Sequence, residues 1–184
     1  MYYAPKIFKL AGAGTESALL QTISVGGTNL LFTLAAMLII DHFGRRKLMI
    51  VGSIGYILSL STTAGAFLFY GSNFDETGSI VVLASLLVFI ASHAFGQGAV
   101  IWVFISEIFP NRVRARGQAL GSFTHWVMAA LISWTFPMIA AASGGFAFAF
   151  YAICMVGQLL WVFYVMPETK GASLEDIQRT LGIE

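Results

Sequence analysis

Charged residues are scarce in this chain. Asp, Glu, Lys and Arg together make up 10% of its 184 residues, whereas about a quarter of an average soluble domain is charged. Hydrophobic residues make up 58%, and the mean hydropathy is +0.81. This composition excludes an ordinary water-soluble domain. It also excludes a nucleic-acid-binding surface, which would need clustered basic residues outside a lipid boundary, so we expect no nucleic-acid partner.

Cysteine is nearly absent as well. Cys154 is the single cysteine, so no disulfide can form within the chain, and we interpret it as a small apolar filler of a helical core. The histidines His42, His93 and His125 occur without an H-E-x-x-H motif or a Cys/His pair, so no metal site is predicted. No nucleophile and base pair stands out. We therefore predict that the protein is not an enzyme and needs no cofactor.

Long uncharged runs take the place of the missing charges. They cover residues 17–40, 48–74, 77–106 and 117–167. A membrane-spanning helix needs roughly 20 apolar residues, and the fourth run would extend about 77 Å as one helix, so we place a turn near 141–145, after Pro137. The sequence thus predicts an all-α integral membrane protein with spans at about 17–40, 48–70, 79–106, 117–141 and 146–166.

Basic residues are missing from every second connection between these spans. Eight of the ten Lys and Arg residues lie in the loop before the second span, in the loop before the fourth and in the tail after the fifth: Arg45, Arg46, Lys47, Arg112, Arg114, Arg116, Lys170 and Arg179. The positive-inside rule places these two loops and the tail, 167–184, in the cytoplasm. The N-terminus, with Lys6 and Lys9, then starts outside.

Polar and aromatic side chains share faces on three of the predicted helices. In the third, His93 and Gln97 lie on one stripe, with Gly98 and Trp102 on a neighbouring stripe. The fourth and the first contribute two further sets: Ser122, Trp126, Ala129 and Ser133 with His125 at their edge, and Gln21, Ser24 and Thr28 flanked by Asn29. We expect these faces to point inward, because an unpaired polar group in hydrocarbon costs several kcal/mol.

These faces allow two interpretations. Hydrogen bonds between neighbouring helices are ordinary in membrane proteins. Trp102 and Trp126, however, lie inside their spans rather than at the membrane interfaces, where tryptophan is usually enriched. Indole rings beside hydroxyl-binding amides would form a platform for a sugar, because a pyranose has apolar C–H faces and equatorial hydroxyls.

Three charged motifs gather at the predicted cytoplasmic face, around residues 41–46, 106–116 and 167–171. They bring Arg45 and Arg46 to the same side of the membrane as Glu107 and Glu168. Bidentate bonds between arginine and carboxylate groups would hold the helices together there and break when the helices separate. We call this set the charge latch.

The order of these motifs resembles the sugar porter family of the major facilitator superfamily. The sequence reads D-x-x-G-R-R at 41–46, G-x-x-x-W-x-x-x-S-E-I-F-P at 98–110, then Arg114 and Gly117, and P-E-T-K-G-x-x-L-E at 167–175. The resemblance covers essentially the whole chain. Segments 2–5, 18–23 and 133–137 look most like bacterial xylose-proton symporters and their relatives.

The resemblance implies a transporter of twelve helices in two six-helix halves that rock around a sugar bound between them. Residues 1–184 correspond to the C-terminal half, from the end of helix 7 to helix 12, so we expect a fragment whose N-terminal half is missing. The implied activity is transport of a monosaccharide, pentose or hexose, by proton symport. A facilitative uniporter and a sugar sensor without flux remain alternatives. The expected partners are the monosaccharide, protons, membrane lipid and the missing half.

The resemblance also assigns roles to individual residues. The sugar-binding set is Trp102, Gly98, Asn29, His125, Trp126 and Gln97. The outer gate is Tyr2 with Tyr3, and the resemblance adds Arg114 to the charge latch of Arg45, Arg46, Glu107 and Glu168. His125 occupies a position where the family usually has Asn or Gln. The third span carries Gln97, Ala99 and Ile101 in place of the family's prolines, so its bending in the transport cycle would differ.

Overall fold

The computed structural model describes residues 4, 6–7, 17–71 and 73–182, and these residues form helices without any strand. The predicted all-α fold class is confirmed. The elements are α2 (Ser17–Phe43), α3 (Arg45–Tyr70), α4 (Glu76–His93), the π-helical turn η1 (Ala94–Gly98), α5 (Ala99–Glu107), α6 (Arg114–Ala142), α7 (Gly144–Tyr164) and α8 (Leu174–Leu181).

Five of the described helical segments are long and apolar enough to cross a membrane: Ile23–Phe43, Arg45–Tyr70, Glu76–Glu107, Arg114–Ala142 and Gly144–Tyr164. Four of them begin two or three residues before the spans inferred from the sequence, and in three of these four, charged residues form the first turn. Arg45, Arg46 and Lys47, for example, open α3. Charge at a helix end can stay in water while the helix continues into an apolar environment.

Short connections bring the helices together as neighbours. Gly44 alone separates α2 from α3, and Ser143 alone separates α6 from α7, inside the turn region 141–145 inferred from the sequence. The Ser143 hydroxyl accepts a hydrogen bond from the amide of Phe146, at 3.3 Å, and so caps α7. Asp75 caps α4 in the same way, since its carboxylate accepts the amide of Gly78 at 2.6 Å.

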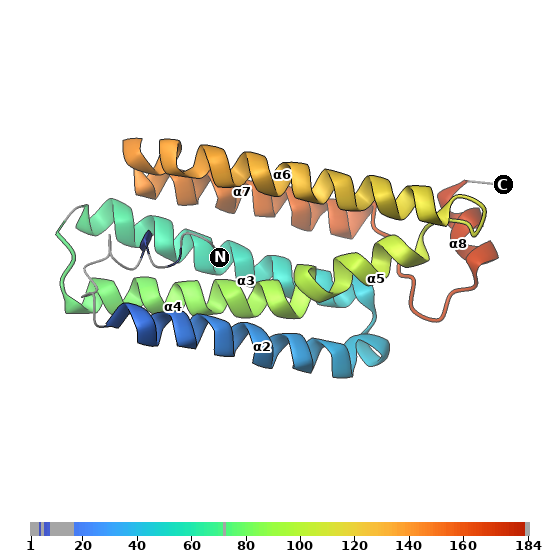
Figure 1. Ribbon diagram of the computed structural model, residues 1–184, viewed down its shortest axis with the longest axis horizontal. Helices are drawn as coiled ribbons and strands as arrows, with labels where there is room; N and C mark the ends of the chain where they lie inside the picture. Colours follow the sequence, from blue (N-terminus) through green and yellow to red (C-terminus); the bar gives the residue numbers. More distant parts are fainter. Residues whose placement is uncertain (1–3, 5, 8–16, 72, 183–184) are drawn as a thin grey trace.

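The long helices lie side by side along one axis, as Figure 1 shows, with α8 at one end of the bundle. Helix α3 packs most extensively against α7 and α4. Buried apolar residues form one core along these helices, including Leu60, Val82 and Phe148. A second core lies toward the end where α3 begins and α5 ends, and includes Leu48 and Val100. We call that end the charged end.

The third long segment is interrupted by the π-helical turn η1, and in Figure 1 it turns toward α6 beyond this point. A π turn accommodates one residue more than an α turn and often occurs at functional sites. It lies where α3 and η1 touch through backbone: a Cβ atom built on Gly96 would be 2.9 Å from the Cα atom of Gly52. Glycine at both positions permits this approach.

Helix α6 lies at the edge of the bundle, and Gly117 is its one buried residue. Its polar face inferred from the sequence is half-buried at Ser122, His125 and Ala129, whereas Trp126 is 61% exposed. Our interpretation of Cys154 as a core filler was wrong. This residue is exposed, because it lies on the face of α7 that turns away from the other described helices.

Candidate functional site

The charged end is organised around Arg45, the first residue of α3. Its Nε and Nη2 atoms donate to the two carboxylate oxygens of Glu107, at 3.0 and 2.7 Å, in a bidentate pair. Its Nη1 atom lies 3.0 Å from the carboxylate of Asp41. The Arg45 side chain is 10% exposed and that of Glu107 is 27% exposed, so the pair is largely removed from water. Bidentate pairs of this kind are among the stronger polar contacts in proteins.

Glu168 acts on the backbone rather than on the guanidinium groups. Its carboxylate accepts the amide N–H groups of Arg45 and Arg46, at 2.9 and 3.2 Å, and thereby caps the N-terminus of α3. Gly44, which precedes the helix, has no side chain to do so. Its φ angle of 88° favours glycine, and a Cβ atom there would lie 2.5 Å from a Glu168 oxygen. A carboxylate at this position also interacts favourably with the helix dipole.

Arg46 and Lys170 extend the network to two helix ends. Arg46 donates to the carbonyl oxygens of Val162 and Phe163, at 3.2 and 2.5 Å, near the end of α7. Lys170 donates from Nζ to the carbonyl oxygen of His42, at 2.6 Å, near the end of α2. These carbonyls belong to the last turns of their helices, where intrahelical donors are lacking and cations are favourable.

Thr169 and Lys170 are participants that sequence reasoning missed. The Thr169 hydroxyl donates to Glu107 at 2.6 Å and so binds the same carboxylate as Arg45. Both residues lie within the motif at 167–171. Their place in this motif was the available signal, because the motif also contains Glu168.

Arg114 occupies a different position from the other predicted latch residues. Its Nε atom donates to the carbonyl oxygen of Phe109, at 3.3 Å, and among the described residues no ion pair between Arg114 and Glu107 is recorded. Both side chains border a hollow of about 460 Å³ that is also lined by Thr169 and by Ile177 of α8. The structure therefore brings together Arg45, Arg46, Glu107 and Glu168 and leaves Arg114 at the rim.

Three aromatic rings meet between α5 and α6. The rings of Trp102 and His125 contact edge to face, with centroids 5.1 Å apart, and His125 contacts Trp126 in the same manner at 5.4 Å. Trp102 is 42% exposed and Trp126 is 61% exposed. We call these residues the aromatic cluster. It offers indole surface and an imidazole from two helices, which is a surface that a sugar ring could contact.

The remaining predicted sugar-binding residues lie in different environments. Asn29 is half-buried on α2, which packs against η1. Gln97 faces α3, where its Nε2 atom donates to the Ser53 hydroxyl at 3.2 Å while its buried Oε1 atom has no recorded partner. Tyr2 and Tyr3, the predicted outer gate, lie outside the described residues.

Gly98 leaves space for a histidine. A Cβ atom at Gly98 would lie 2.9 Å from the carbonyl oxygen of His93 and 3.3 Å from its Nε2 atom. The Nδ1 atom of His93 is 2.5 Å from the hydroxyl of Tyr56. Sequence reasoning missed Tyr56, and it also missed Ser53, whose hydroxyl accepts a second amide from Gln158 at 3.3 Å. Their spacing of three residues, on the face of α3 toward η1, was the available signal.

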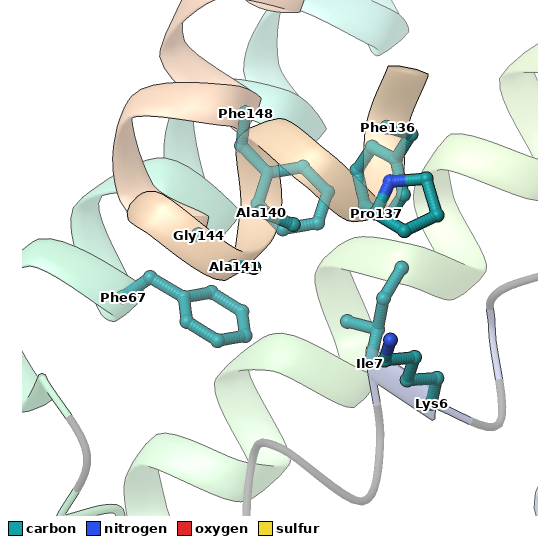
Figure 2. A pocket seen from close by; sticks show the side chains of 9 residues that line it. All are labelled: Lys6, Ile7, Phe67, Phe136, Pro137, Ala140, Ala141, Gly144 and Phe148. Carbon is teal, nitrogen blue, oxygen red and sulfur yellow. The ribbon is translucent and has the colours of Figure 1, made fainter. Parts of the chain in front are cut away.

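An apolar hollow of about 310 Å³ lies apart from these residues, between α3, α6, α7 and the described part of the N-terminal segment. Figure 2 shows Phe67 and Phe148 on one side of it and Pro137 near Ile7 and Lys6 on the other. Apart from Lys6, the described residues that line it are apolar. Within the described residues, no group of three or more His, Cys, Asp or Glu side chains is arranged to hold a metal ion.

Known proteins are similar to this chain in sequence and in fold. Residues 1–181 match the family described as Sugar (and other) transporter. The chain is 38% identical to the D-xylose-proton symporter of Escherichia coli (strain K12), over 97% of this chain and 36% of that protein. It is 33% identical to the glucose facilitated diffusion protein of Zymomonas mobilis, over 97% of this chain and 38% of that protein.

A solved structure supports the same relationship. The chain is similar to the major facilitator superfamily proton:xylose symporter XylE bound to 6-bromo-6-deoxy-D-glucose, with a TM-score of 0.84 and 39% identity, over 97% of this chain and 38% of that chain. The chain thus spans somewhat over a third of the length of these relatives. On its sequence and its fold, it belongs to the sugar transporter family of the major facilitator superfamily and is part of a multi-pass membrane protein.

Proposed function

We propose that the chain is part of a transporter that moves a monosaccharide, pentose or hexose, by alternating access together with protons. The observation that carries this proposal is the aromatic cluster. Trp102, His125 and Trp126 come from two helices, contact one another edge to face and keep the two indoles accessible. An indole can pack against the C–H face of a sugar ring while neighbouring nitrogen atoms bind its hydroxyls.

The sugar site is completed from two directions in this proposal. Asn29 supplies an amide from α2, and Gly98 and Gln97 belong to the helical turn that precedes Trp102 on the same segment. Residues 1–184 form the partial C-terminal half of the transporter, and its N-terminal half lines the other side of the sugar. The resemblance to the family assigns the role of outer gate to Tyr2 and Tyr3. Support for the second half comes from the relatives, of whose length the chain covers 36–38%.

The charged end faces the cytoplasm in this proposal, and so does the tail 167–184. Support comes from the basic residues, which lie in the loops at this end and in the tail, as the positive-inside rule requires. The bidentate pair of Arg45 and Glu107 joins α3 to α5, and Glu168 joins the tail to α3. These bonds hold the helices together when the cytoplasmic side is closed and break when it opens.

Replacing Trp102 tests the proposal. In the full-length transporter in its membrane, Trp102→Ala should weaken sugar affinity by about tenfold, because an aromatic contact contributes about 1 kcal/mol beyond its buried area. Trp134→Ala is the matched control, since Trp134 is 75% exposed on α6 and has no ring contact recorded among the described residues. Unchanged uptake and affinity for Trp102→Ala would overturn the assignment of the site.

Facilitated diffusion is a second candidate, and one observation favours it: the relative from Zymomonas mobilis is described as a glucose facilitated diffusion protein. The two modes differ in whether protons accompany the sugar. Proton symport predicts that adding sugar to de-energised cells makes the medium more alkaline, whereas facilitated diffusion predicts sugar entry without this change. Sugar binding without any entry would instead identify a sensor.

A further inference from the structure

His93 is a polar ring within the long apolar segment Glu76–Glu107, at the last position of α4 before the π-helical turn. Its partner Tyr56 is 6% exposed, and the hydrogen bond to His93 is the one recorded for the Tyr56 hydroxyl among the described residues. A buried phenol needs an acceptor for its O–H group. The hydroxyl therefore donates to Nδ1, and the neutral imidazole carries its own proton on Nε2.

The Nε2 side of the ring lies against Gly98. A side chain at residue 98 would come within 3.3 Å of Nε2, so glycine is what leaves room for the imidazole. Gly98 and Trp102 are four residues apart at the start of α5 and share a face of the helix. His93 thus lies at one end of a strip that continues over Gly98 to Trp102 and the aromatic cluster.

One further observation bears on His93. Its side chain is half-buried rather than buried, so part of its ring is accessible. A hydrogen-bond donor therefore faces the strip next to which Trp102 and His125 meet.

We propose that His93 is a further sugar-contacting residue, which donates a hydrogen bond from Nε2 to one sugar hydroxyl, and that Tyr56 positions its imidazole by fixing the tautomer. This inference rests on the proposed function and narrows it: the substrate carries a hydroxyl at the position that reaches His93. A sugar lacking that hydroxyl leaves the Nε2 proton without a partner, and such unpaired donors are what polar sites reject.

Monodeoxy sugars test the inference in the full-length transporter. The parent sugar and its analogues, each lacking one hydroxyl, are compared by equilibrium binding to the wild-type protein and to His93→Phe, His93→Gln and Tyr56→Phe. The wild-type protein should prefer the parent sugar over one of the analogues by about tenfold through this bond. His93→Phe should abolish the preference at that one position and retain it at the others.

The other variants separate contact from architecture. His93→Gln should restore part of the preference, because its amide can donate. Tyr56→Phe should reduce the same preference by about twofold, because the imidazole proton can then occupy either nitrogen. If His93 had a merely structural role, His93→Phe would weaken the binding of all the sugars equally, with no hydroxyl position singled out. That result would overturn the inference.

Failure of this inference can be distinguished from failure of the proposed function. If His93→Phe retains every preference while Trp102→Ala still weakens sugar binding, the inference is wrong and the sugar site stands. If Trp102→Ala has no effect, the proposed site itself is wrong. Where His93→Phe fails to fold, Tyr56→Phe with unchanged preferences overturns the inference alone.

Discussion

The charged end and the aromatic cluster differ in how far this chain satisfies their polar groups by itself. At the charged end, the carboxylate of Glu168 accepts three backbone amides and that of Glu107 binds both Arg45 and Thr169. In the aromatic cluster, the two indoles are 42% and 61% exposed, and the recorded contacts join only α5 and α6. The charged end is therefore a stabilising structure, whereas the cluster presents surface to be covered by another molecule or domain.

The largest effect should come from removing Arg45. Arg45→Ala leaves the largely buried carboxylate of Glu107 without its main partner, and breaking such a pair costs about 3 kcal/mol or more of unfolding free energy. Arg112→Ala, in the exposed loop before α6, is the matched control and should change stability by less than about 0.5 kcal/mol. Chemical unfolding in detergent measures both. Equal effects of the two substitutions would show that the bond between Arg45 and Glu107 does not stabilise the charged end.

Gly44 gives the next largest effect. Gly44→Ala places a side chain at a φ of 88° and against the Glu168 carboxylate, so we expect a loss of about 2 kcal/mol from backbone strain and displacement of the cap together. Gly71→Ala isolates the first contribution, because Gly71 has a φ of 60° but open space around it, and should lose about 1 kcal/mol. A larger loss at Gly71 would show that Glu168 adds little.

Replacing Trp126 should affect sugar affinity more than stability, whereas replacing Arg45 should mainly affect stability. Trp126→Ala removes a side chain that is 61% exposed, so the unfolding free energy should change by less than about 1 kcal/mol. Sugar affinity should nevertheless fall by about tenfold, because the indole is part of the proposed platform. Parallel unfolding and binding measurements on the full-length protein test this. Strong destabilisation with unchanged affinity would place Trp126 among the structural residues.

The smallest effect concerns the pH dependence of α8 at the charged end. The Ser173 hydroxyl donates to the carboxylate of Asp176, at 2.7 Å, and this bond lowers the pKa of the exposed Asp176 carboxyl. Because the folded pKa lies below the unfolded one, the contribution is present above the unfolded pKa and is lost as pH falls through the folded pKa. The protection of α8 amides against hydrogen exchange, taken relative to their intrinsic rates at each pH, should therefore fall on acidification, and Ser173→Ala should weaken that dependence.

The sequence predicted the helices and the meeting of the charged motifs because both rest on composition. Uncharged runs of sufficient length form helices in lipid whatever their detailed order, and motifs such as those around Arg45 and Glu107 return to the same side after each pair of spans. The pairing of these two residues thus follows from alternation along the chain.

The finer contacts could not be predicted in this way. Glu168 was expected to bind arginine side chains, but it binds the backbone of α3, whose first N–H groups have no partner within the helix. The spacing of Ser53 and Tyr56 places both on one face of α3, but it does not indicate that Tyr56 meets His93, because that pairing depends on how α3 packs against α4. The π-helical turn at Ala94–Gly98 depends on how η1 meets Gly52, which is a tertiary property.

The single-residue connections at Gly44 and Ser143 have a mechanical consequence. They lie at opposite ends of the bundle, so α2 is tethered to α3 at one end and α6 to α7 at the other. A one-residue connection keeps the two helix ends that it joins close together, so a change of angle between the helices displaces their far ends most. Because α3 has 26 residues and is therefore about 39 Å long, a tilt of about 10° between α2 and α3 would part their far tips by about 7 Å. Changes of angle between α2 and α3 and between α6 and α7 would thus be largest at opposite ends of the bundle.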